Sequence, residues 1–132
     1  MDNVIVQKLL EFLIHSPIDF VLIGGFAAVI HGSNQTTQDI DICILFTPES
    51  LNDLREALKP IHPHFRNDVE ISFGDFDFNG SNKMSHHLET DLGILDLVSK
   101  VPGVGSFYDV LKNADEIEMF GGSCFVISMS DL

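Results

Sequence analysis

Residues 39 to 44, DIDICI, alternate strictly between polar side chains and isoleucine. This period of two predicts a β-strand, because successive side chains of a strand point to opposite faces of its sheet. Asp39, Asp41 and Cys43 therefore share one face. Aspartate is disfavoured in strands, and two carboxylates this close repel and raise each other's pKa. Two explanations are open. Either the strand is a solvent-facing edge with ordinary surface aspartates, or a divalent cation that prefers oxygen ligands offsets the repulsion.

A short apolar run and a double glycine precede this strand. Residues 20 to 23, FVLI, predict a buried strand. Gly24 and Gly25 permit a sharp turn, and a helix that begins there presents unpaired N–H groups to an anion. Residues 26 to 30 predict a short helix, and residues 33 to 38 predict a polar loop. A phosphate cradle that faces two carboxylates is the apparatus of phosphoryl or nucleotidyl transfer, so the cation explanation gains weight.

The remaining chain mixes helix and strand patterns and predicts an α/β (α+β) fold, a mixed β-sheet flanked by helices. Two histidine pairs, at 62 and 64 and at 86 and 87, are interpreted as ordinary loop and strand residues and not as metal ligands. Residues 69–80 fit a strand or an irregular flap, and the pattern does not decide between them. Further helices are expected at residues 3–15, 48–59 and 106–114, and further strands at 83–89, 94–99, 116–120 and 124–128.

Asp96 is a single charge within the apolar strand expected at residues 94–99. A charged side chain is rarely buried unless it is paired or bound to a metal ion. Asp96 is therefore either a hydrogen-bonded structural aspartate or a third acidic residue of the same site as Asp39 and Asp41.

These residues together resemble the signature of the polymerase-β-type nucleotidyltransferase superfamily. In that signature, a Gly-Gly or Gly-Ser turn is followed, roughly a dozen residues later, by two acidic residues that are separated by one residue. The segment TDLGILDLV, residues 90–98, is similar to the strand with the family's third carboxylate. The resemblance covers residues 20–132 and is closest to small prokaryotic nucleotidyltransferase-like proteins, some of which are toxin or antitoxin components. The matching positions between the glycines and the aspartates are Ala27-Ala28, His31-Gly32 and a threonine at 36 or 37.

The resemblance implies a metal-dependent nucleotidyltransferase that moves a nucleoside monophosphate group from a nucleoside triphosphate to a hydroxyl acceptor. The catalytic and metal-binding residues that it implies, for two Mg²⁺ ions or alternatively Mn²⁺, are Asp39, Asp41 and Asp96. The residues that it implies for the triphosphate are Gly24, Gly25 and Ser33. Neither the base nor the acceptor, whether a small molecule, a protein or an RNA, can be inferred from these motifs. A sugar- or antibiotic-modifying transferase would differ in its acceptor alone.

Two departures from the family pattern favour an alternative function. Relatives often have an arginine where this chain has Gln35, and an amide cannot supply the charge that pairs with phosphate. Relatives also continue with a basic C-terminal helix, so residues 1–132 are expected to form a single nucleotidyltransferase-like domain without that helix. The alternative is a catalytically weak or inactive relative that acts by binding a partner protein, as in a toxin–antitoxin pair.

Composition limits the partners. The net charge is −13 with seven Lys and Arg residues, which argues against broad electrostatic binding to DNA or RNA but permits a bound nucleotide and a basic partner protein. No apolar run approaches the roughly 20 residues of a membrane span, and the amino end lacks the basic region of a signal peptide. Cys43 and Cys124 lie in apolar runs and are expected to be buried, reduced thiols, which predicts a cytoplasmic protein.

Overall fold

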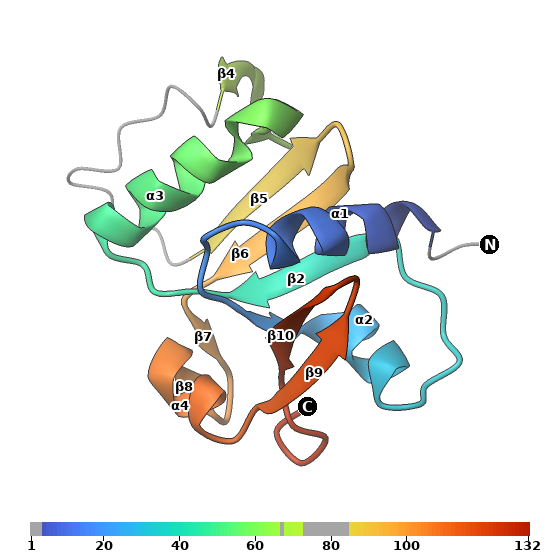
Figure 1. Cartoon of the computed structure of the whole chain (residues 1–132). Helices are drawn as coiled ribbons and strands as arrows, with labels where there is room; N and C mark the ends of the chain where they lie inside the picture. Colours follow the sequence, from blue (N-terminus) through green and yellow to red (C-terminus); the bar gives the residue numbers. More distant parts are fainter. Residues whose placement is uncertain (1–3, 67, 73–84) are drawn as a thin grey trace.

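The computed structural model describes residues 4–66, 68–72 and 85–132 (Figure 1). Its helices are α1 (Val4–Ile14), α2 (Gly24–Ile30), α3 (Pro48–Leu58) and α4 (Phe107–Lys112), with a 3-10 helix at Lys59–Ile61. The strands in the first half of the chain are β1 (Val21–Ile23), β2 (Asp39–Cys43), β3 (His64–Phe65) and β4 (Asp68–Ser72). The later strands are β5 (Ser85–Thr90), β6 (Gly93–Val98), β7 (Lys100–Val101), β8 (Gly105–Ser106), β9 (Asp115–Met119) and β10 (Gly122–Val126).

The main sheet of the described residues has eight strands in the order β4-β3-β5-β6-β2-β1-β10-β9, and β7 pairs with β8 separately. The sheet is mixed. β2 is parallel to β6 and β1 is parallel to β10, whereas β1 and β2 are antiparallel to each other. Figure 1 shows α1 and α3 lying across one face of this sheet. The predicted fold class, a mixed sheet flanked by helices, is confirmed.

The strand β2 lies in the interior of the sheet, between β1 and β6. The explanation of its aspartates as residues of a solvent-facing edge strand is therefore wrong. Ile40 and Ile42 are fully buried in the same core cluster as the leucines of α1, whereas Asp39 and Asp41 on the opposite face are half-buried. The alternation in the sequence thus separates an apolar face, which packs into the core, from a polar face that carries both carboxylates.

Local sequence signals account for the helices. The Thr47 hydroxyl oxygen accepts a hydrogen bond from the Ser50 N–H (3.1 Å), and Pro48 occupies the first turn of α3. Ser106 and Asp109 form a reciprocal capping box at the start of α4. None of the described helices is long and apolar enough to cross a membrane. Both cysteines are buried and have no disulfide bond, as expected, and burial raises the pKa of each thiol to about 11.

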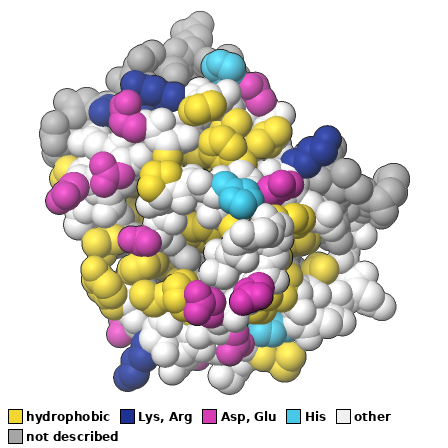
Figure 2. All heavy atoms as spheres, in the orientation of Figure 1, with side chains coloured by type: hydrophobic (Ala, Val, Ile, Leu, Met, Phe, Trp, Pro, Cys, Tyr) yellow, Lys and Arg dark blue, Asp and Glu magenta, His cyan; other side chains and the backbone are white. Residues whose placement is uncertain are grey.

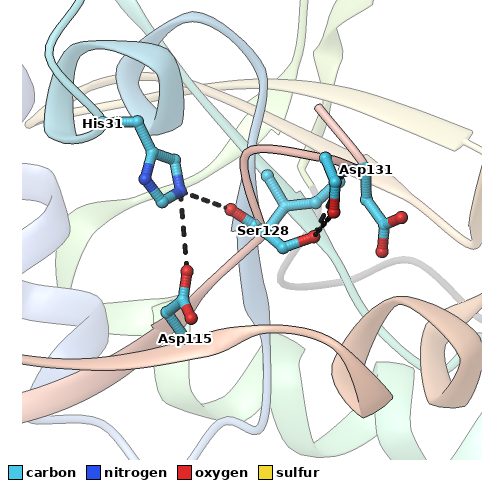
Figure 3. Close-up of polar contacts among 6 residues, drawn as sticks. His31, Asp115, Ser128 and Asp131 are labelled. Carbon is cyan, nitrogen blue, oxygen red and sulfur yellow. Dashed lines mark hydrogen bonds and ion pairs between the residues drawn. The ribbon is translucent and has the colours of Figure 1, made fainter.

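A polar contact joins the end of α2 to the end of β10 (Figure 3). The Nε2 atom of His31 donates a hydrogen bond to the carbonyl oxygen of Ile127 (2.6 Å) and lies 4.0 Å from Oδ2 of Asp115. Next to it, the Ser128 hydroxyl oxygen accepts a hydrogen bond from the Asp131 N–H (3.2 Å). These contacts hold the last residues of the chain against the helix that follows β1.

The sequence-based expectations for three segments are compared with the structure. His64 and Phe65, expected in a loop, form β3 because their backbone pairs with both β4 and β5. Residues 68–72 form the strand β4, so the first part of the segment that fitted a strand or a flap is a strand. Residues 73–84 lie outside the described residues. They include the rest of that segment and the start of the strand expected at 83–89. The short β7–β8 hairpin was not predicted, because two-residue strands leave no periodic pattern.

A buried residue of β6 provides a test of how the hydrophobic core is packed. Leu97 is fully buried, so we expect Leu97→Ala to lower the free energy of unfolding by about 2–5 kcal/mol through lost packing and a new cavity. The matched control is Met129→Ala, at a side chain that is 64% exposed, which should change stability by less than about 0.5 kcal/mol. Urea unfolding followed by circular dichroism measures both. Equal losses in the two variants would contradict this packing.

Candidate functional site

Two carboxyl groups meet on the polar face at the centre of the sheet. Asp41 of β2 and Asp96 of β6 are direct partners in the parallel register, so their side chains point to the same face. The pKa of Asp41 is raised from 3.8 to about 6, first by burial, then by its hydrogen bond with Asp96 and by the negative charges of Asp96 and Asp39. Carboxylate oxygens can only accept hydrogen bonds, so this close approach favours the protonated form of Asp41.

Asp39 lies on the same face, two residues before Asp41 along β2. Its partner in the register is Ile94, so no carboxylate of β6 stands opposite it. The Thr37 hydroxyl donates a hydrogen bond to the Asp39 carbonyl oxygen (3.2 Å), which fixes the entry to the strand. Asp39 therefore acts on the pair through its charge, and the structure places all three predicted aspartates on one face.

Asp96 has two further partners, neither of which was predicted. His87, its register partner on β5, lies with Nδ1 2.9 Å from Oδ1 of Asp96. The Nη1 atom of Arg66 lies 3.9 Å from the same oxygen. The Arg66 N–H also donates to the His87 carbonyl oxygen (3.0 Å), which ties the turn after β3 to β5. Asp41, Asp96 and His87 thus form a row across three adjacent strands.

A sequence signal for His87 existed. Because His86 and His87 are adjacent in a strand, they must face opposite sides of the sheet. His86 is buried and its ring stacks on Phe46 with centroids 5.5 Å apart, whereas His87 lies on the carboxylate face. A charge inside an apolar strand needs a partner, and the neighbouring strand offers one. Arg66 gave no such signal, because its approach depends on how the chain turns between β3 and β4.

The glycine pair lies directly beside Asp41. Ile23, the last residue of β1, is the register partner of Asp41, and α2 begins at Gly24. Gly24 has φ +75°, and a Cβ atom there would lie 2.9 Å from Cγ of Asp41, too close for any side chain. At Gly25, a Cβ atom would lie 3.3 Å from both Nε2 of Gln35 and Oγ1 of Thr37. The carboxylate thus packs against bare backbone at the start of α2.

The loop that follows α2 is held by its own polar groups. Ser33 is exposed, its N–H donates to the Ala28 carbonyl oxygen (2.9 Å), and its hydroxyl oxygen accepts from the Gln35 N–H (3.2 Å). The side-chain amide of Gln35 donates to the Gly25 carbonyl oxygen (3.2 Å). Gln35 therefore ties the loop to the glycine pair, and the described contacts of Ser33 join it to Ala28 of α2 and to Gln35 of the loop.

The donor atoms suit a hard divalent cation in kind. Carboxylate oxygens are the ligands that Mg²⁺ and Mn²⁺ prefer, and a cation would offset the repulsion that raises the pKa of Asp41. In the described part of the chain, however, no group of three or more His, Cys, Asp or Glu side chains is arranged to hold a metal ion. Asp41 and Asp96 are register partners, and Asp39 lies on the same face two residues before Asp41.

Comparisons with known proteins identify the fold. No protein-family model matches the chain, and no curated protein matches it. Among solved structures, the candidate nucleotidyltransferase TM1012 from Thermotoga maritima matches 96% of this chain and 76% of its own, with a TM-score of 0.57 and 15% identity. JHP933 from Helicobacter pylori matches over 97% of this chain, which spans about half (51%) of that protein, with a TM-score of 0.48 and 15% identity. The predicted resemblance is confirmed at the level of the fold, which is nucleotidyltransferase-like.

The raised pKa of Asp41 gives a test of the carboxyl pair. Between about pH 4 and pH 6, Asp41 is protonated to a greater extent in the folded state than in the unfolded chain, so its contribution to stability falls as the pH rises through this window. At pH 7, Asp41→Asn should raise the free energy of unfolding above that of the parent, because the amide carries no charge. The expected gain is about 1 kcal/mol, since solvent screens part of the repulsion in the parent. Urea unfolding measures it. The gain should vanish below pH 4.

Glu118→Gln, at an exposed position on β9, removes an acidic group away from this site and serves as the matched control. It should leave the difference in unfolding free energy between pH 4 and pH 7 as it is in the parent. If Asp41→Asn showed the same pH dependence as the parent, the two carboxyl groups would not be in contact.

Proposed function

We propose that this protein is a metal-dependent nucleotidyltransferase, which moves a nucleoside monophosphate group from a nucleoside triphosphate to a hydroxyl acceptor. The observation that carries the proposal is the contact between Asp41 and Asp96 directly beside the backbone of Gly24, on a nucleotidyltransferase-like fold. Carboxylates next to a glycine turn are what phosphoryl-transfer chemistry needs, because the triphosphate and its cations must sit together.

In the proposed reaction, the acceptor oxygen forms a bond to the α-phosphorus while the bond from that phosphorus to the bridging oxygen breaks, and pyrophosphate leaves. The residues proposed to hold two Mg²⁺ or Mn²⁺ ions are Asp39, Asp41 and Asp96. When bound, such ions would lower the charge on the phosphates and favour ionisation of the acceptor hydroxyl.

Asp96 is the proposed general base. It lies between Asp41 on one side and His87 on the other, and its side chain is 14% exposed. The contact with His87 Nδ1 orients the carboxylate, as a partner of a catalytic base should. In this role Asp96 accepts the proton of the acceptor hydroxyl as the new bond to phosphorus forms.

The proposed triphosphate contacts are the N–H groups at Gly24 and Gly25, since the first N–H groups of a helix have no partner within it. Ser33, which the family pattern adds, has its hydroxyl oxygen engaged with the Gln35 N–H. Arg66 offers the positive charge that Gln35 cannot supply. Its guanidinium group is 38% exposed beside Asp96, and it can form paired hydrogen bonds with phosphate oxygens.

A second function is favoured by the surroundings of Asp96. Because His87 and Arg66 already lie next to its carboxylate, Asp96 also suits a structural role that needs no metal ion. The protein would then act by binding a partner protein, as toxin–antitoxin components do. Isothermal titration with ATP, CTP, GTP and UTP, each with Mg²⁺, separates the two functions. Metal-dependent binding of a nucleotide supports the transferase, and its absence supports the partner-binding protein.

The transferase is tested by two isosteric substitutions. Asp41→Asn and Asp96→Asn should each lower the transfer of label from α-³²P-labelled nucleoside triphosphates by at least about 100-fold, because each removes a carboxylate that the reaction needs. The assay offers a panel of sugars, nucleosides, RNA and proteins as acceptors. Glu118→Gln should keep the parent rate. Parent-level transfer by Asp41→Asn would rule out the mechanism.

Substitution of Arg66 tests phosphate binding separately from proton transfer. Arg66→Gln should raise the KM for the nucleoside triphosphate by about tenfold, the scale of one charge-assisted contact, and change kcat much less. Arg66→Lys should recover part of the loss, because the charge is restored. Lys112→Gln, at an exposed position on α4, is the matched control. An unchanged KM in Arg66→Gln would remove Arg66 from the phosphate site.

A further inference from the structure

A groove lies at the end of β1 and β2 that is opposite to the carboxylates. Ile23 pairs with Asp41 at one end of these strands, whereas Val21 pairs with Cys43 at the other. The groove is lined by the residues before β1, those after β2, and the facing sides of α3 and α4, and it has a volume of about 560 Å³. A second hollow of about 360 Å³ continues from it towards β10, and the two share Ile18, Asp19, Phe107 and Tyr108. We call both together the α3–α4 groove.

The groove combines apolar side chains with carboxylates. Tyr108 on α4 is 64% exposed and Phe125 on β10 is 37% exposed, although large aromatic side chains normally bury most of their surface. Figure 2 shows hydrophobic side chains gathered between the positions of α3 and α4, with acidic side chains beside them. An aromatic side chain in a groove with a polar rim is typical of a protein-binding surface.

The charge of the groove has one sign. Its described lining includes Asp19, Asp53 and Glu56, and no lysine or arginine. Oε2 of Glu56 lies 2.9 Å from Nζ of Lys59 and 3.8 Å from Nε of Arg55, and these two cations offset the charge of that carboxylate. Within the described residues, neither Asp19 nor Asp53 has a hydrogen bond or an ion pair, so no direct partner offsets the charge of these two groove-lining residues.

The negative charge of the α3–α4 groove determines which kind of partner it can bind. A second copy of the chain would bring another net charge of −13 and a second set of the same carboxylates against the groove, which repulsion opposes. A partner with lysine or arginine side chains would instead be attracted electrostatically by each carboxylate. An apolar side chain of the same partner would bury the exposed ring of Tyr108.

We propose that the α3–α4 groove binds a lysine- or arginine-rich segment of a partner protein, with an apolar side chain of that segment packed against Tyr108. Because the groove and the carboxylate site lie at opposite ends of β1 and β2, partner and nucleotide do not compete for the same surface. This binding function is independent of the proposed transfer reaction and requires none of its residues.

The probe is a fluorescein-labelled synthetic peptide of alternating lysine and leucine, whose binding is followed by fluorescence anisotropy. Tyr108→Ala and the double variant Asp19→Asn with Asp53→Asn should each weaken its binding by about tenfold or more. A peptide with glutamate in place of lysine should not bind. Asp41→Asn should bind the probe as the parent does, so failure of the transfer reaction and failure of this proposal are distinguished.

Matched controls separate the groove from the general negative charge of the protein. Met129→Ala removes a side chain that is as exposed as Tyr108, at 64%, and does not line the groove. The double variant Glu118→Gln with Asp91→Asn removes two exposed carboxylates elsewhere. Both should bind the probe within about twofold of the parent, whereas a loss equal to that of the groove variants would overturn the proposal. Circular dichroism confirms that each variant is folded.

Sedimentation equilibrium tests whether a second copy of the chain binds in the groove instead. The parent should remain a monomer over the concentration range of the binding assay. A dimer that Tyr108→Ala dissociates would assign the groove to a second copy of the chain and overturn the proposal of a basic partner.

Discussion

The contact between the carboxyl groups of Asp41 and Asp96 is the constraint around which the rest of the structure is arranged. Two acids side by side on a half-buried surface are unfavourable, and the raised pKa of Asp41 reflects this cost. The sheet tolerates it because the other face of the same two strands is apolar. Ile40 and Ile42 of β2 and Leu95 and Leu97 of β6 are all fully buried. Burial of one face thus holds the acids together on the other.

The same packing fixes the register. If β2 slipped by one residue against β6, its isoleucines would turn to the polar face and its aspartates into the core. The hydrophobic core therefore excludes every register except those that keep the acids on the polar face. The row of Asp41, Asp96 and His87 across three strands is a consequence of this selection. Acids held together against their mutual repulsion are typical of functional sites.

Two surfaces of the described residues differ in character and lie at opposite ends of β1 and β2. At one end, the carboxyl pair packs against the backbone of Gly24, where a side chain would not fit. At the other end, carboxylates surround exposed aromatic rings in the α3–α4 groove. The first surface suits a small charged ligand, because its groups converge on one point. The second suits an extended basic ligand, because its charges are spread along a groove.

Sequence alone determined what depends on near neighbours in the chain. The alternation in residues 39–44 determined a strand with both aspartates on one face, and the capping residues determined the starts of α3 and α4. Tertiary structure alone decided that Asp41 stands opposite Asp96, that His87 and Arg66 approach Asp96, and that β2 is an interior strand. The physical reason is that the pleat and the helix caps are set within a few residues, whereas the order and register of strands far apart in sequence are selected by how the whole core packs.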